Sequence, residues 1–218
     1  MPVINPSQSS GGGGGTADGK GAMPARATGR YYYIGLGGNM SGGSNNHGGG
    51  TSSFGMAHRF SETVTITHLG AWVTTLLAAS NFQIAIYARS AAGRATGPCL
   101  AKTSNISSAA VGGIVGAITG GTLHSGGQAT LPAGDYVFLM AGDTSTGSAP
   151  RFMTYPYGVH SLLVSEGAVA LANMGVGNQP TLRYNSQTYG TWPDMTTQDA
   201  NYLEEAYAYL GVPIYKVA

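Results

Sequence analysis

Three runs of alternating apolar and polar residues between positions 60 and 89 constrain the fold more than any other feature of the sequence. The apolar positions are Val64 and Ile66, then Leu69, Ala71 and Val73, then Phe82, Ile84 and Ile86. A period of two places the members of each run on one face of a β-strand. Because a sheet with one apolar face must cover that face, the sequence predicts an antiparallel sheet with a second layer.

The alternation changes phase once within this segment. Ile66 and Leu69 are three residues apart instead of two, so the change falls at Thr67 and His68. A β-bulge or a strand break at this point would keep both halves of the run on the same face.

A strand with two apolar faces is predicted at residues 135–141. One face carries Tyr136, Phe138 and Met140, and the other carries Val137, Leu139 and Ala141. A strand of this kind is expected at the centre of a sheet, covered on both sides.

Three further elements are expected nearer the ends of the chain. Residues 31–36 (YYYIGL) predict a short aromatic strand, and residues 213–217 predict a closing strand. Residues 197–210 are the best helix candidate, because Leu203, Tyr207 and Leu210 form an apolar stripe that ends at Gly211.

Composition excludes several classes of partner. Only 9% of the 218 residues are charged, which suits a protomer whose surface is covered by identical neighbours. The net charge is +1 and the ten Lys and Arg residues are scattered, which argues against nucleic-acid binding. No apolar run reaches the roughly 20 residues that cross a bilayer, and no secretory signal opens the sequence. We therefore expect no membrane insertion and synthesis in a host cytoplasm.

Catalytic and metal-binding patterns are poorly represented. None of the nine acidic residues forms a pair that predicts glycosidase geometry, and the five histidines lack metal-ligand spacing. Cys99 is the single cysteine, so no intrachain disulfide is possible, and no His or Asp at a recognisable spacing marks it as a nucleophile. The expectation is a protein that is not an enzyme and needs no cofactor and no metal.

Five segments, in their order along the chain, carry a family resemblance. They are TVTITHLGAWVTT (63–75), IAIYA (84–88), GPCL (97–100), LPAGDYVFLMA (131–141) and GVPIYKVA (211–218). Together they resemble the β-sandwich modules at the distal ends of tailed-bacteriophage fibres and minor structural proteins. The resemblance implies a virion context and, because small fibre modules generally associate by threes, a homotrimer. With the periodicity it gives the expected fold class: an all-β, antiparallel, jelly-roll-like β-sandwich with a Gly-rich extended N-terminal arm and one short C-terminal helix.

The domain organisation follows from a change in composition. Residues 1–29 are interpreted as a Gly-rich N-terminal anchoring arm and residues 30–218 as the β-sandwich domain, with irregular Tyr-rich loops at about 154–196. Consecutive glycines lose much conformational entropy on ordering, so an ordered arm requires a partner surface, here other virion structural proteins. The anchoring candidates are Gly11, Gly12, Gly13, Gly14, Gly15 and Arg26.

Aromatic residues in the loop-like C-terminal part are the candidates for ligand binding. They are Tyr155, Tyr157, Tyr184, Tyr189 and Trp192. Rings held in loops offer flat apolar faces with polar edges, on which sugar rings stack. The alternative is that the same rings fill a subunit interface, where Tyr and Trp are also enriched.

The function expected from the sequence is that of a non-enzymatic virion protein. A fibre or spike that docks by its N-terminal arm and contacts a host surface glycan comes first, with a tail fibre favoured over a head spike. The alternatives are a capsid decoration protein that stabilises the head and a stand-alone carbohydrate-binding, lectin-like module. A depolymerase would need a carboxylate pair that the sequence does not display.

Overall fold

The computed structural model describes residues 26–33, 41–46, 52–143, 151–154, 181–185, 188–198, 201–205 and 213–218. β-strands make up most of this part of the chain. The strands are β1 (Tyr31–Tyr33), β2 (Ser41–Asn46), β3 (Ser52–Phe60), β4 (Val64–Thr75), β5 (Asn81–Arg89), β6 (Ala95–Thr103), β7 (Ile106–Ser107), β8 (Gly112–Gly120), β9 (His124–Ser125), β10 (Gln128–Leu131), β11 (Gly134–Gly142), β12 (Arg151–Thr154), β13 (Thr181–Asn185), β14 (Tyr202–Glu205) and β15 (Pro213–Val217), with a 3-10 turn, η3 (Met195–Thr197).

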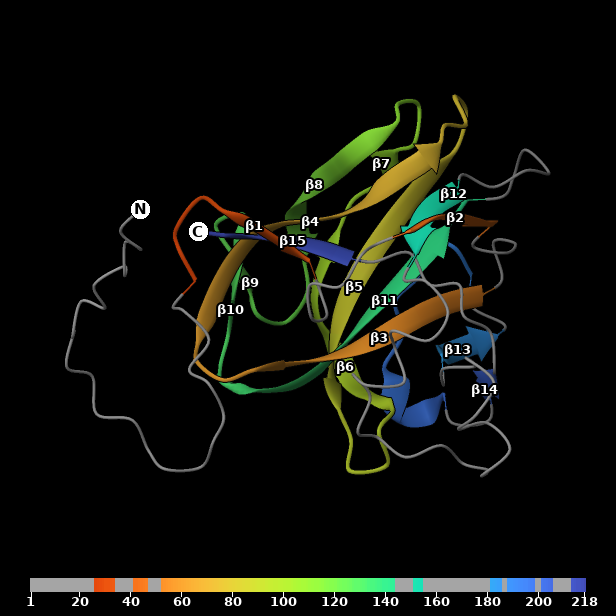
Figure 1. Ribbon diagram of the computed structural model, residues 1–218. Helices are drawn as coiled ribbons and strands as arrows, with labels where there is room; N and C mark the ends of the chain where they lie inside the picture. Colours follow the sequence, from red (N-terminus) through yellow and green to blue (C-terminus); the bar gives the residue numbers. More distant parts are fainter. Residues whose placement is uncertain are drawn as a thin grey trace, which may run out of the picture.

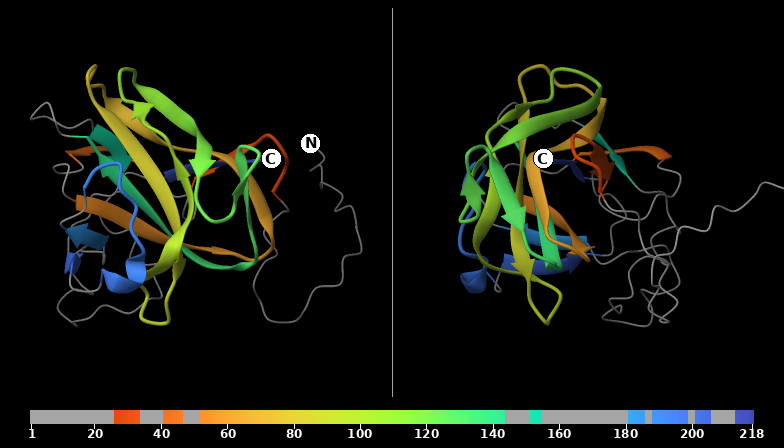
Figure 2. Two further views of the ribbon diagram at one scale, coloured as in Figure 1. Left: turned by 180° about the vertical axis from the view of Figure 1, so that it is seen from behind. Right: turned by 90° about the vertical axis from the view of Figure 1, so that its left-hand side faces the viewer.

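The strands form an antiparallel β-sandwich of the jelly-roll-like kind that the sequence predicts (Figures 1 and 2). In one layer, the β4 sheet, β4 lies between β8 and β10 on one side and β15 and β12 on the other. In the other layer, the β11 sheet, the order is β6, β5, β11, β3, β13 and β14. β8 pairs with both β4 and β6 and so joins the two layers along one side.

The alternation in β4 is confirmed. All five of its predicted apolar positions, from Val64 to Val73, are buried. The predicted bulge is also present: Val217 and Lys216 of β15 are consecutive, but they pair with Ile66 and His68 of β4. Thr67 is therefore the extra residue, and it restores the inward phase for Leu69.

The core between the layers is built from these inward side chains. Phe82, Ile84 and Ile86 of β5 and Phe138 and Met140 of β11 lie opposite the β4 residues, all fully or almost fully buried. The closing strand is confirmed, since β15 contributes Tyr215 and Val217 to the same core. The first half of the predicted aromatic strand is present as β1, which pairs with β15, and residues 34–36 lie outside the described residues.

A second apolar cluster lies on the outer face of the β11 sheet. It contains Val137 and Leu139 of β11 together with Ala85 and Tyr87 of β5. The prediction that the β11 segment is central and covered on both faces is confirmed. The prediction that the β5 run buries only one face is wrong, because Ala85 and Tyr87 are fully buried beneath a later part of the chain.

The prediction of a helix at residues 197–210 is wrong for the described part of that range. Residues 195–197 form η3, and Tyr202–Glu205 form β14, which pairs with Thr181–Asn185 of β13. Pairing with a strand about 20 positions earlier overrides the local 3.6-residue pattern, as tertiary context commonly does. Residues 206–212 lie outside the described residues.

Candidate ligand-binding site

The covered outer face of the β11 sheet is the foundation of the candidate site. Tyr184 of β13 and Met195 of η3 pack on Tyr87 and Leu139, and Trp192 lies partly buried against the same cluster. The covering residues come from the stretch that the sequence marks as Tyr-rich and irregular. They place aromatic side chains over a rigid sheet.

Residues 188–198 are fixed to the sheet by a short series of hydrogen bonds. Tyr87 Oη donates to the Pro193 carbonyl at 3.0 Å, and the Gly97 amide donates to Thr196 Oγ1 at 3.1 Å. The Asp194 side chain caps η3 by accepting from the Thr196 amide at 2.9 Å. Trp192, between these points, therefore has a defined position.

Trp192 belongs to a polar network, the aromatic–amide cluster, which consists of Gln83, Asn105, Tyr189 and Trp192. Trp192 Nε1 donates to Gln83 Oε1 at 2.9 Å, and Gln83 Nε2 donates to Asn105 Oδ1 at 2.7 Å. Tyr189 Oη donates to the same Asn105 oxygen at 3.0 Å. Gln83 is buried while Asn105 is exposed, so the network runs from the sheet surface to solvent.

The side chains of the cluster are uncharged. Burial, and secondly the nearby carboxylate of Asp143, raise the pKa of Tyr189, so its hydroxyl stays protonated at neutral pH. Among the described residues, the Asn105 amide nitrogen has no hydrogen-bond partner, since the bonds above use only its oxygen. Two half-buried rings and one amide donor thus belong to the same hydrogen-bonded network, which links them through Gln83 and Asn105.

The structure brings together only part of the predicted ligand set. Tyr189 and Trp192 lie in the cluster, whereas Tyr184 is fully buried in β13, where its hydroxyl accepts from the Ala95 amide at 2.8 Å. The expectation that Tyr184 lies in a loop is wrong, and its ring offers no face to a ligand. Tyr155 and Tyr157 lie outside the described residues.

Sequence reasoning missed Gln83 and Asn105. Gln83 lies on the same outward face of β5 as the apolar residues Ala85 and Tyr87. A polar residue in line with two apolar ones was the sequence feature that could have indicated a buried hydrogen bond at this position. Asn105 follows β6 in a short turn and carries no comparable signal.

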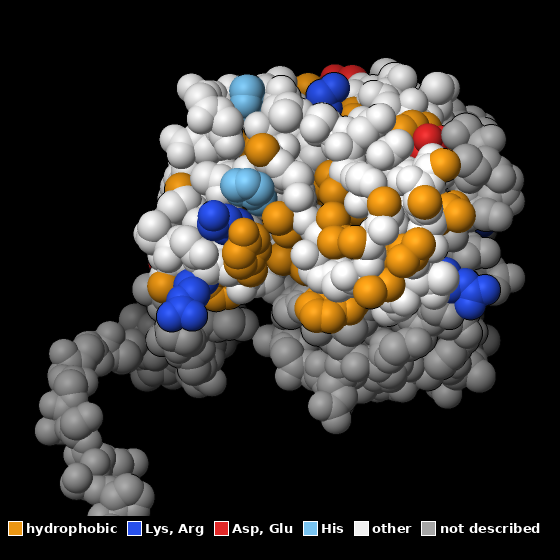
Figure 3. Space-filling model, turned by 90° about the horizontal axis from the view of Figure 1, so that it is seen from above, with side chains coloured by type: hydrophobic (Ala, Val, Ile, Leu, Met, Phe, Trp, Pro, Cys, Tyr) orange, Lys and Arg blue, Asp and Glu red, His pale blue; other side chains and the backbone are white. Residues whose placement is uncertain are grey.

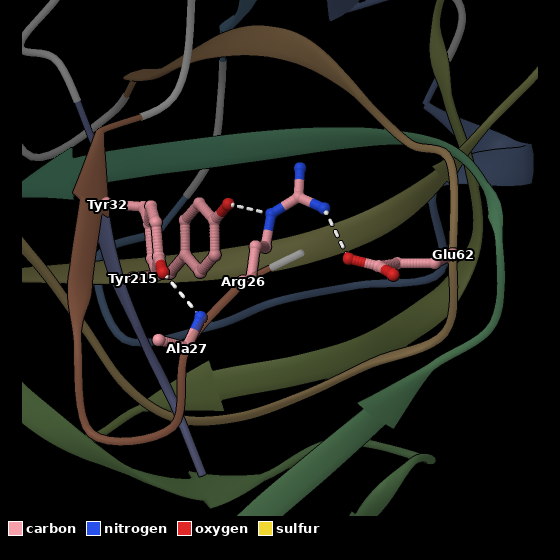
Figure 4. Close-up of polar contacts among 5 residues, drawn as sticks. All are labelled: Arg26, Ala27, Tyr32, Glu62 and Tyr215. Atoms are coloured by element: carbon pink, nitrogen blue, oxygen red, sulfur yellow. Dashed lines mark hydrogen bonds and ion pairs between the residues drawn. The ribbon is translucent and has the colours of Figure 1, made fainter. Parts of the chain in front are cut away.

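Arg26, a predicted anchoring residue, contacts the sandwich itself (Figure 4). Its Nε donates to Tyr215 Oη at 2.6 Å, and its Nη1 lies 3.4 Å from Glu62 Oε1. The guanidinium carbon lies 5.0 Å from the centre of the Phe60 ring. Phe60 belongs to β3 and Tyr215 to β15, so Arg26 joins the two layers on the side that β8 leaves open. We call Arg26, Phe60, Glu62 and Tyr215 the Arg26 cluster; Gly11 to Gly15 lie outside the described residues.

The remaining groups that could take part in chemistry are the His, Cys, Asp and Glu side chains of the described residues. No three His, Cys, Asp or Glu side chains within the described ranges lie close enough together to hold a metal ion. Burial raises the pKa of the Cys99 thiol to about 11, which leaves it protonated at neutral pH. No helix in the described part of the chain has the length and apolar character needed to cross a membrane.

Compared with protein-family models, with curated proteins and with solved structures, the chain has no match in any of the three.

Proposed function

We propose that this chain is a non-enzymatic structural protein of a tailed phage or phage-like particle, a fibre or spike that contacts the host surface. A tail fibre is favoured over a head spike. Residues 1–29 would dock on other virion proteins, and the sandwich would carry the contact surface. Support comes from the resemblance of five segments to phage fibre modules and from the antiparallel sandwich that contains them.

The aromatic–amide cluster is the observation that carries the host-contact part of the proposal. Trp192 and Tyr189 present ring faces on which the C–H face of a sugar can stack, and the Asn105 amide can donate to a hydroxyl. Because its side chains are uncharged and the carboxylate of Asp143 lies close enough to raise the pKa of Tyr189, the cluster suits a neutral sugar better than an acidic one.

A homotrimer remains part of the proposal, on the low charge and the family resemblance. The two apolar faces of β11 give no support to a trimer, because residues of the same chain cover both. Sedimentation of the purified chain at micromolar concentration is expected to give the mass of three chains; a stable monomer would leave the trimer without support.

A capsid decoration protein is the second candidate, and the outer face of the β4 sheet favours it. The side chain of Trp72 is 37% exposed there and lies over Gly113 of β8. Tyr31 and Val111 are exposed hydrophobic residues at the same sheet, and Figure 3 shows hydrophobic side chains over this upper face with basic side chains at its margins. An apolar sheet face of this kind could lie on a capsid shell. A free lectin, the third candidate, would share the sugar site but need no docking arm.

The chain's two tryptophans separate the first two candidates, because they lie on the outer faces of different sheets. In the fibre or spike, Trp192→Ala reduces adsorption of particles to host cells at least tenfold, while the chain's occupancy on the particle is unchanged. Trp72→Ala is the matched control and leaves adsorption intact. The opposite pattern, lost occupancy with Trp72→Ala and normal adsorption with Trp192→Ala, would support the decoration protein and contradict the fibre. Particles that an antibody to the chain fails to label would contradict both.

A further inference from the structure

His58 of β3 lies beside the Arg26 cluster, inside the sandwich. Its ring centre is 4.7 Å from that of Phe60 and 6.0 Å from that of Tyr215, the two rings that Arg26 also contacts. The Phe138 ring lies 6.1 Å from His58 and 6.2 Å from Phe60. His58 Nε2 is buried and has no hydrogen-bond partner among the described residues.

Among the residues that the structure describes, the charged and titratable groups around His58 offer it no anion. Arg26 is the nearest cation, Tyr215 accepts from Arg26, and Tyr136 is the partner of His58 across the β3–β11 ladder. Glu62, the one described carboxylate of the Arg26 cluster, already pairs with Arg26. Tyr32 stacks on Tyr215, at 5.5 Å between ring centres.

A proton on His58 would therefore create a second cation next to Arg26, and no side chain or backbone group in the described part of the chain accepts from its buried N–H. The side chain of Arg26 is only 12% exposed, so water screens the repulsion weakly. The backbone segment that carries Arg26 is the part most easily displaced. It is joined to β15 by two hydrogen bonds, from the Gly29 amide to the Val217 carbonyl and from the Val217 amide to the Arg30 carbonyl.

We propose that the Arg26 cluster is an acid-sensitive attachment, in which protonation of His58 releases residues 26–30 from the open side of the sandwich. The chain before Arg26 is then held at a fixed point near neutral pH and set free in acid. This property concerns the sandwich alone and does not depend on the proposed virion role.

The expected pH range follows from proton linkage. Burial, and secondly Arg26, lower the pKa of His58 from 6.5 to about 4. A group whose pKa is lower in the attached state destabilises that state as the pH falls from 6.5 to 4, with no further change below 4. If release restores the ordinary pKa, the equilibrium between attached and released states shifts on the order of a hundredfold between pH 7 and pH 4.

Amide hydrogen exchange of Gly29 and Val217 at pH 7 and pH 4, corrected for intrinsic rates, tests this directly in the full chain. The protection of these two amides is expected to fall between tenfold and a hundredfold at pH 4, while amides of β11 keep theirs. In His58→Phe, which keeps an aromatic ring but cannot be protonated, the two amides should stay protected at pH 4. His58→Leu serves the same purpose if His58→Phe does not fold.

Glu62 also loses its charge in acid, and Glu62→Gln separates its effect from that of His58. This variant should still lose protection between pH 7 and pH 4. Unchanged protection of Gly29 and Val217 in the wild-type chain at pH 4 would overturn the proposal. So would an equal loss in the His58 variant, which would make Glu62 the group that responds.

Discussion

At the scale of single residues, Gln83 holds the aromatic–amide cluster together, because it is buried and bonds both Trp192 and Asn105. Gln83→Met keeps the length of the side chain but leaves Trp192 Nε1 without an acceptor. We expect a loss of about 1–2 kcal/mol in the free energy of unfolding, measured by urea denaturation. Gln128→Met, on an exposed strand position, is the control and should change stability by less than about 0.5 kcal/mol. Equal losses in both variants would mean that the network adds nothing.

Cys99 gives a prediction about pH. Because burial raises the pKa of its thiol to about 11, the reactive thiolate is a minor species at pH 8. Reaction with a disulfide reagent should be roughly a hundredfold slower in the folded chain than in urea, and the folded rate should rise about tenfold per pH unit towards pH 10. If the reaction rate of the folded chain instead stops rising near pH 9, the pKa of the Cys99 thiol is not raised and the prediction is wrong.

The candidate site shows what single residues could and could not predict. Trp192 and Tyr189 could be picked out as candidates from the sequence because both are aromatic residues in loop-like sequence, and loops often carry binding residues. Tyr184 has the same chemistry, but it is buried because it lies in β13, which pairs with β3. A strand of five residues has too short a pattern for this pairing to be predicted from the sequence. Asn105 could not be predicted, because its role depends on Gln83 and Tyr189 meeting it in space.

At the scale of elements, the packing of β4 against β8 requires a glycine at position 70, where a side chain would collide with the neighbouring strand. A Cβ at Gly70 would meet the Ile114 carbonyl oxygen and lie 2.7 Å from Val115 Cα in the neighbouring strand. A Cβ at Gly113 would lie 3.5 Å from the Trp72 ring, an ordinary contact. We expect Gly70→Ala to lower the free energy of unfolding by about 2–4 kcal/mol or to prevent folding. Gly113→Ala should change it by less than about 1 kcal/mol, and similar effects of the two substitutions on thermal unfolding would contradict this packing.

Strands with a clear period of two were predictable, and short strands at the sheet edge were not. β4 follows from side-chain alternation, and the bulge at Thr67 follows from its change of phase, while β11 follows from a run of residues that is apolar on both faces. β14 has four residues, too few to distinguish a strand from a helix by pattern, and its pairing with β13 decided the outcome. The second buried face of β5 depends on residues 188–198 and so lies beyond any local pattern.

At the scale of the whole molecule, Arg26 belongs with the sandwich, because its side chain contacts Phe60, Glu62 and Tyr215. The boundary between arm and sandwich is therefore placed before Arg26. Deleting residues 1–25 should leave the free energy of unfolding unchanged, because that stretch has no apolar periodicity with which to build a core. Deleting residues 1–29 should lower it by about 2–4 kcal/mol, from the lost Arg26 hydrogen bond and ring contacts. The ion pair contributes little, since the Glu62 side chain is 47% exposed. Equal stability of the two truncated chains would show that Arg26 does not join the layers.

The fold class could be predicted because alternating apolar residues identify the side chains of the core. The arrangement of the outer surface could not be predicted in this way. The outer faces of both sheets are formed by residues distant in sequence, with Trp192 over β5 on one face and Trp72 beside β8 on the other. The sequence predicted that the chain would be a sandwich, while the arrangement of these faces had to come from the structure.

Fluorescence of single-tryptophan chains, titrated with a panel of neutral and acidic bacterial surface polysaccharides, tests the central claim most directly. Trp72→Phe leaves Trp192 as the only tryptophan, and Trp192→Phe leaves Trp72. The account predicts a saturable shift of Trp192 emission with a neutral polysaccharide, lost when Tyr189→Ala is added, and no shift of Trp72. Contradiction would come from a Trp192 signal that no polysaccharide changes, or from a response that appears only at Trp72.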